Sequence, residues 1–128
     1  MTLLSGEFIV FALTGIDKWN VRFVVHASIP TSFGDYVQHI GRAGRDGELS
    51  DAIILYSPRD VERAVQVVSR KKSGSELQDV LLRVLDFHDF LESSAECRRS
   101  LILQHFDEDP ATCVDRHGET CDVCHVIP

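Results

Sequence analysis

The chain has 128 residues, 44% of them hydrophobic and 26% charged, and its 20 acidic and 13 basic side chains give a formal net charge of −7. This composition is typical of a packed domain and excludes a disordered tail. The acidic balance argues against a protein that binds nucleic acid over its whole surface, because such proteins are usually basic. We expect no membrane span, since no run approaches roughly 18 apolar residues, and no signal peptide, since Glu7 interrupts the apolar start.

The first 70 residues alternate between strand and helix patterns. Residues 21–26 (VRFVVH) form a β-branched run that predicts a buried strand. Thr31 or Ser32 then caps a predicted helix that reaches Ile40, and the glycine-spaced stretch 41–47 ends it. Residues 52–56 (AIILY) predict a second strand. Because strands separated by helices pair in parallel, this half predicts one edge of an α/β sheet.

Helical patterns continue through most of the second half. Ser57 and Pro58 provide a cap and a first-turn proline for a helix that follows the second strand. The basic stretch 70–75 is the predicted domain boundary, which separates residues 1–70 from residues 71–128. Apolar residues at helical spacing then predict an amphipathic helix that ends near Glu92. A further helix is expected to start at Ser93 or Ser94 and to stop at 107–110.

All four cysteines lie in the last third of the chain, which is not how a disulfide-stapled secreted protein distributes them. Their spacing is C-x15-C-x7-C-x2-C, formed by Cys97, Cys113, Cys121 and Cys124. A C-x2-C pair brings two thiolates to one metal, and zinc favours four such ligands. We therefore predict a reducing, intracellular compartment and a closed, structural zinc site in a small helical subdomain.

Other interpretations of the cysteines stay open at this stage. Cys121 and Cys124 could form a redox pair, although the strand-to-helix setting of thioredoxin-like sites is missing. The cysteines could also be buried without a ligand. His117 and His125 lie close enough in sequence to replace one cysteine in the metal site. The metal is therefore a firmer prediction than its complete ligand set.

The most specific string is Q-H-I-G-R-A-G-R-D-G, which runs from Gln38 to Gly47. Two arginines three residues apart beside a helix end are expected to share one face and to present planar forks to phosphate oxygens. The glycines allow the backbone to approach a ligand closely. A basic surface patch is the plainer interpretation, but the full string after a strand and a helix favours a nucleotide contact.

This string resembles the last motor motif of superfamily-two helicases, in the form found in RecQ helicases. The upstream residues 14–26 (TGIDKWNVRFVVH) resemble the preceding motif of that family, and residues 54–60 (ILYSPRD) resemble a segment that follows. The segment that starts at Cys97-Arg98-Arg99 and carries the other three cysteines resembles the family's zinc-binding region, with a Bloom-type spacing. Leu13 stands where the family has a glycine, and the segment before it is several residues short.

The resemblance implies a partial RecA-like parallel-sheet lobe followed by a small helical zinc-binding subdomain. It also implies roles for particular residues. Arg45 would act as an arginine finger on the γ-phosphate, with Arg42 and Gln38 on the same inter-lobe surface. Gly41 and Asp17 would also contact or sense the nucleotide. Arg98 and Arg99 would contact DNA or serve in packing, and both interpretations stay open.

The given sequence contains no G-x-x-x-x-G-K-[ST] loop and no acidic metal-binding motif of an ATP site. The resemblance therefore implies a fragment of an ATP-dependent 3′–5′ DNA helicase, a class that unwinds DNA in replication, recombination and repair. ATP and magnesium would bind only in a complete enzyme, with a missing N-terminal RecA-like lobe, and the fragment would be inactive alone. DNA is the expected partner and the nucleus the expected location. The alternative is a noncatalytic, zinc-stabilised module that binds DNA or protein.

Overall fold

The computed structural model describes residues 8–10, 19–113 and 120–126. Within these residues a three-stranded sheet has the order β1-β2-β3, formed by β1 (Phe8–Val10), β2 (Phe23–His26) and β3 (Asp51–Ile54). Both pairings are parallel, and Val24 of β2 aligns with Ile9 of β1 and Ala52 of β3. The predicted α/β class and its parallel pairing are confirmed. The strand β1 was not among the predicted elements.

Helix α1 (Phe33–Ile40) connects β2 to β3 and begins where the sequence predicts it. The Ser32 hydroxyl accepts a hydrogen bond from the backbone N–H of Asp35 at 3.1 Å, so it satisfies one of the free amides of the first turn. Gly41 is the C-cap residue, and its N–H donates to the carbonyl of Val37 at 3.0 Å. The helix therefore ends directly before Arg42.

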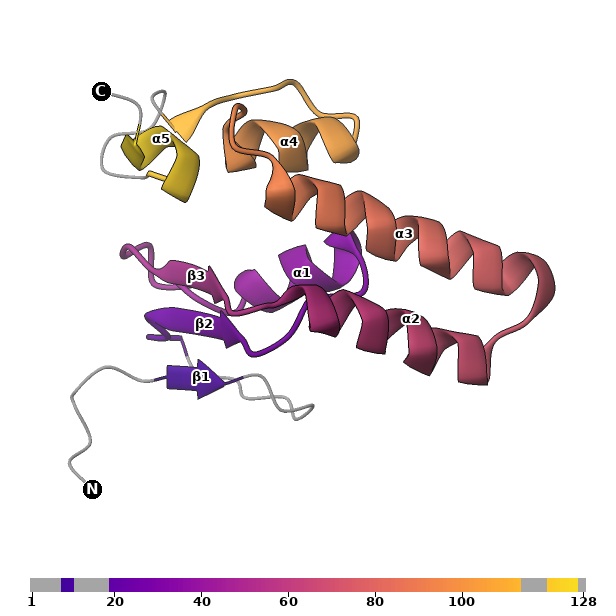
Figure 1. Cartoon of the computed structure of the whole chain (residues 1–128). Helices are drawn as coiled ribbons and strands as arrows, with labels where there is room; N and C mark the ends of the chain where they lie inside the picture. The colour runs from indigo at the N-terminus through magenta and orange to yellow at the C-terminus, as the bar shows by residue number, and fades with distance from the viewer. Residues whose placement is uncertain (1–7, 11–18, 114–119, 127–128) are drawn as a thin grey trace.

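Helices α2 (Pro58–Lys71) and α3 (Gly74–Glu92) form an antiparallel hairpin beside the sheet (Figure 1). Ser57 and Asp60 form a capping box at the start of α2, as the serine–proline pair predicts. Only Lys72 and Ser73 separate the two helices, so the predicted boundary at 70–75 is a tight turn.

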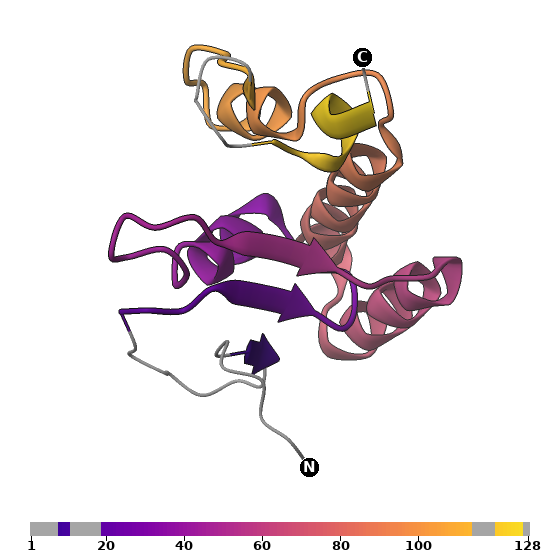
Figure 2. The same ribbon diagram turned by 90° about the vertical axis from the view of Figure 1, so that its left-hand side faces the viewer.

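The remaining helices lie beyond the outer edge of β3, as two views at right angles show (Figures 1 and 2). They are α4 (Arg98–His105) and α5 (Asp122–Val126). The predicted start of α4 at Ser93 or Ser94 is wrong, because the N-cap is Cys97. The short helix α5 was predicted as loop, since five residues carry no clear periodicity.

One aromatic cluster joins the two halves of the chain. The ring of Phe33 in α1 packs edge-on against Phe87 and Phe90 of α3, with centroid separations of 5.1 and 5.0 Å. Ile29 and Tyr36 complete this buried core, and partly buried residues of β3, α2 and α4 pack around it. Large aromatic side chains dominate the energetics of such cores. The predicted units 1–70 and 71–128 therefore share one core, and their independence stays a prediction.

Among the described residues, no helix combines the length and apolar character that a bilayer crossing needs.

Candidate metal centre and arginine loop

The sulfur atoms of Cys97, Cys113, Cys121 and Cys124 converge to within 4.8 Å of one another. Cys97 lies at the N-cap of α4, and the C-x2-C pair brackets the first turn of α5. The Sγ atom of Cys97 lies 3.5 Å from that of Cys113 and 4.0 Å from that of Cys121. Residues distant in sequence thus form one four-sulfur cluster.

This cluster fits a zinc ion. A tetrahedral site with Zn–S bonds of about 2.3 Å has sulfur–sulfur edges of about 3.8 Å, close to the separations observed here. Backbone amides point at the sulfurs, because the N–H of Cys113 donates to Cys97 Sγ and that of Cys124 donates to Cys121 Sγ, both at 3.4 Å. Such second-layer bonds fix the ligand orientation. His125 is not within this cluster, and His117 lies outside the described residues.

The thiols of this cluster differ in their tendency to ionise. Burial raises the pKa of Cys113 to about 12, together with hydrogen bonds to Cys97 and Cys121. Hydrogen bonds with Cys121 and Cys97 raise the pKa of Cys124 to about 11, with burial adding to them. Burial also opposes ionisation of Cys97, but backbone amides of Ser100 and Cys113 outweigh it and lower its pKa to about 6. A bound divalent cation would favour the thiolate form of all four cysteines, because metal ligation requires deprotonated sulfur.

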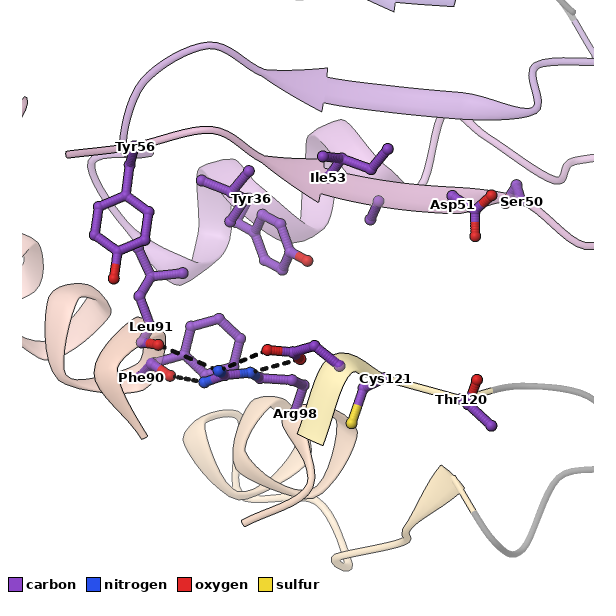
Figure 3. A pocket seen from close by; sticks show the side chains of 13 residues that line it. Tyr36, Ser50, Asp51, Ile53, Tyr56, Phe90, Leu91, Arg98, Thr120 and Cys121 are labelled. Atoms are coloured by element: carbon purple, nitrogen blue, oxygen red, sulfur yellow. Dashed lines mark hydrogen bonds and ion pairs between the residues drawn. The ribbon is translucent and has the colours of Figure 1, made fainter. Parts of the chain in front are cut away.

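Arg98 connects the cysteine cluster to the end of α3 (Figure 3). Its Nε and Nη2 atoms donate to the two carboxylate oxygens of Asp122 at 3.0 and 2.9 Å, in a bidentate pair. The same guanidinium donates to the carbonyl of Phe90 and, at 3.2 Å, to that of Leu91. It also lies 5.3 Å from the centroid of the Phe90 ring. Four of its donor bonds are thus used within the chain, which favours the packing interpretation over DNA contact.

Arg99, the second predicted DNA contact, is partly buried on the first turn of α4. No nucleic acid contact follows from this position alone, so its role stays a prediction.

The segment 41–50, which we name the arginine loop, is held in a fixed shape. Arg22 forms an ion pair with Asp46 and donates to the carbonyls of Glu48 and Leu49 at 3.4 and 3.3 Å. The hydrogen bond from the Arg22 side chain lowers the pKa of Asp46 below its usual range. Gly44 has a φ of 65°, and a Cβ atom there would lie 2.9 Å from the Ser50 hydroxyl oxygen. Glycine is therefore required at this turn.

Both predicted phosphate-binding arginines lie in this loop, directly after α1. Because α1 has ended and Gly44 adopts a left-handed conformation, both arginines lie outside the helix, and their sharing of one face stays a prediction. Arg45 is exposed, whereas the Nε of Arg42 is buried and has no hydrogen-bond partner among the described residues. Gln38 in α1 and Gly41 at the start of the loop are both exposed. Asp17 lies outside the described residues.

A histidine pair that the sequence did not single out lies behind this loop. The Nε2 atom of His26, at the end of β2, is 3.2 Å from the Nδ1 atom of His39 in the last turn of α1. Burial lowers the pKa of both histidines. His26 is 5% exposed, and its ring also packs against Tyr36. The pair couples the end of the strand to the helix that precedes Arg42.

The fold and the cluster together define a mixed α/β protein with a structural zinc-binding module. Comparison with known proteins places it more narrowly, since residues 58–125 match the RecQ zinc-binding family. The chain belongs to the RecQ family. It is 38% identical over 115 residues to the RecQ-like DNA helicase BLM of Xenopus laevis, which covers 86% of the chain and 8% of that relative.

Other relatives come from bacteria and mammals. The chain is 36% identical over 110 residues to the ATP-dependent DNA helicase RecQ of Pasteurella multocida, which covers 86% of the chain and 17% of the relative. The corresponding identity to the ATP-dependent DNA helicase Q1 of Rattus norvegicus is 36% over 110 residues, with 86% of the chain and 16% of the relative covered. The chain thus spans less than a fifth of each of these relatives.

Proposed function

We propose that the chain is the last part of a second RecA-like lobe, followed by the zinc-binding subdomain of an ATP-dependent DNA helicase. The observation that carries this proposal is the combination of a rigid arginine loop at the end of a parallel α/β sheet with a four-thiolate cluster. Family membership supports the proposal, since two of the relatives are named ATP-dependent DNA helicases. The boundary between the two units is proposed at residues 70–71.

The proposed role of the arginine loop is to contact a nucleotide that another lobe holds. Phosphoryl transfer spreads negative charge over the terminal oxygens, and a positioned guanidinium stabilises that charge. Arg45 is the proposed finger, because it is exposed and follows the fixed turn at Gly44. Arg42, Gln38 and Gly41 would line the same inter-lobe surface. Asp17 would link the nucleotide to lobe movement.

The proposed zinc ligands are Cys97, Cys113, Cys121 and Cys124. Bound zinc would offset half of the charge of the four thiolates and fix the start of α4 against α5. Because Arg98 joins Asp122 to the last carbonyls of α3, this order would extend to the aromatic core. The ion is thus proposed to stabilise the fold and not to take part in catalysis.

The proposed enzyme moves along DNA in the 3′–5′ direction and acts in the nucleus in replication, recombination and repair. Arg99 is the stronger candidate of the two adjacent arginines for a phosphate contact, since Arg98 is engaged within the chain. ATP and magnesium belong to the complete enzyme, which includes an N-terminal RecA-like lobe.

An ATPase assay tests this proposal. The isolated 128-residue chain and the complete protein are compared with single-stranded DNA, ATP and magnesium. We expect turnover by the complete protein and none above background by the isolated chain. Robust magnesium-dependent turnover by the isolated chain would show that it holds a nucleotide site of its own.

The second candidate function is a noncatalytic, zinc-stabilised binding module. The net charge of −7 favours a protein partner for such a module over DNA. A complete protein that shows no DNA-dependent ATP turnover, but whose zinc-loaded chain binds a partner, would favour this candidate. Salt-dependent DNA binding that is lost in Arg99→Ala would instead identify a DNA module.

A further inference from the structure

A pocket of about 630 Å³ lies between the outer edge of β3 and the metal centre (Figure 3). Residues 50–54 form one wall, and the end of α3 with residues 120–122 forms the other. Its volume is within the range of protein ligand sites, roughly 300–1,000 Å³. Arg98 and Cys121 line it, whereas none of the residues predicted to contact the nucleotide does. The pocket thus meets the arginine loop only at Ser50, the last residue of that loop.

The edge of β3 that borders this pocket offers backbone hydrogen-bonding groups. β3 is the last strand of the sheet among the described residues. The N–H groups of Asp51 and Leu55 donate to the carbonyls of Arg22 and His26 on the β2 side, both at 2.8 Å. Because N–H direction alternates along a strand, the N–H of Ala52 points the other way, toward the pocket. An edge of this kind is a template for an added strand.

The side chains along this edge are apolar and exposed. Ala52 is exposed and Ile53 is 39% exposed, and both line the pocket. Leu55, just after β3, is 60% exposed but does not line it. The opposite wall contributes Phe90 and Leu91. At about 3.3 Å per residue, the four residues of β3 span about 13 Å. The groove is thus long enough for a short extended segment with aliphatic side chains.

Charged groups at the groove favour a basic segment. Arg98 and Asp122 neutralise each other through their bidentate pair. Asp51, at one end, is exposed and forms no ion pair with another described residue in the groove. At the other end, Tyr56 donates a hydrogen bond to the carboxylate of Glu92, whose side chain is 59% exposed. Asp51 thus lines one end of the groove, and Glu92 does not line the groove but contacts Tyr56 at the other end. These carboxylates disfavour phosphate and favour lysine or arginine.

We propose that this groove binds an extended segment of a partner protein, which adds to the sheet beside β3 and alternates basic with aliphatic side chains. Main-chain hydrogen bonds to β3 would supply affinity, and the apolar wall and the terminal carboxylates would supply specificity. This interaction is independent of the nucleotide chemistry proposed above.

Fluorescence anisotropy of the zinc-loaded chain tests the proposal with a labelled six-residue peptide of alternating lysine and valine. Ala52→Pro removes the outward N–H and leaves the bonds to β2 in place, because proline is tolerated on edge strands. Ala52→Val is the matched control that keeps the N–H. We expect Ala52→Pro to weaken binding by roughly tenfold or more and Ala52→Val to bind like wild type. Equal affinities for the two variants would overturn the proposal.

Two further peptides test the wild-type chain, so the result does not depend on how Ala52→Pro folds. A lysine–valine peptide that is N-methylated at every amide has no N–H group to donate and cannot pair along the strand edge. A glutamate–valine peptide keeps the pairing and reverses the charge. We expect both to bind roughly tenfold more weakly than the parent peptide. Equal binding of either peptide, or direct binding of a labelled single-stranded oligonucleotide that Ala52→Pro abolishes, would contradict the proposed partner.

Discussion

Replacement of Arg98 by alanine tests the connection between the metal centre and the aromatic core. The substitution removes a bidentate pair with Asp122 and the donor bonds to the carbonyls of Phe90 and Leu91. A hydrogen bond that involves a charged group contributes about 1.5–3 kcal/mol, and loss of one partner of a buried pair costs about 3–5 kcal/mol. The Asp122 side chain is 67% exposed and can be rehydrated, which reduces the loss. We expect the free energy of unfolding to fall by about 2–4 kcal/mol.

The assay is urea unfolding of the zinc-loaded chain, followed by circular dichroism. Arg98→Lys keeps the charge but not the planar fork, so it should recover less than half of the loss. The matched control is Arg63→Ala. The Arg63 side chain is 74% exposed, and its ion pair with Asp60 is a single contact of 3.4 Å from Nη1 to Oδ1. That variant should stay within about 0.5 kcal/mol of wild type. An Arg98→Ala variant as stable as Arg63→Ala would refute the proposed connection.

Three other predictions concern the metal, the histidine pair and the arginine loop. Cys121→Ser should lower the zinc content from about one ion per chain, which metal analysis measures. It should also unfold residues 71–128 more than the sheet, which proteolysis measures. Equal loss of structure in both parts would contradict this prediction. Because burial lowers the pKa of His26 and His39, the folded state binds fewer protons than the unfolded state. The stabilising contribution of these histidines should therefore be fully present above their unfolded pKa, about 6.5, and decrease as the pH falls below it. Denaturation between pH 7.5 and 5.5 measures the pH dependence of the free energy of unfolding. An unchanged dependence in His39→Gln would contradict the prediction. Gly44→Ala should lower the free energy of unfolding by about 1–3 kcal/mol, because of the positive φ and the clash of the new Cβ with Ser50. Gly47→Ala is the control, because its φ is 83° but nothing lies within 4 Å of a Cβ placed there. An equal loss of stability in the two variants would show that the clash is unimportant.

Local signals in the sequence predicted most of the helices and strands correctly. Ser32 and the Ser57–Pro58 pair lie at the starts of α1 and α2, because caps act through neighbouring backbone groups. The start of α4 was misplaced because Cys97, a member of the four-sulfur cluster, occupies the N-cap in place of a serine. Cap preference alone does not identify such a position.

Long-range contacts explain what the sequence could not predict. Arg98 and Asp122 are 24 residues apart, and no local pattern indicates their pairing. The contact between His26 and His39 depends on how α1 packs against β2. The convergence of four cysteines was predictable because C-x2-C spacing is itself a local constraint, whereas the groove beside β3 arises only from tertiary packing.

The most direct test of the proposed motor function is the effect of Arg45→Ala on ATP turnover by the complete protein with single-stranded DNA. Arginine fingers contribute roughly 10³–10⁵ in rate, so we expect a loss of that order in kcat, with ATP affinity little changed. Arg59→Ala, an exposed arginine in the first turn of α2, should leave turnover unaffected. Wild-type turnover in Arg45→Ala would contradict the proposed contact between this arginine and the nucleotide.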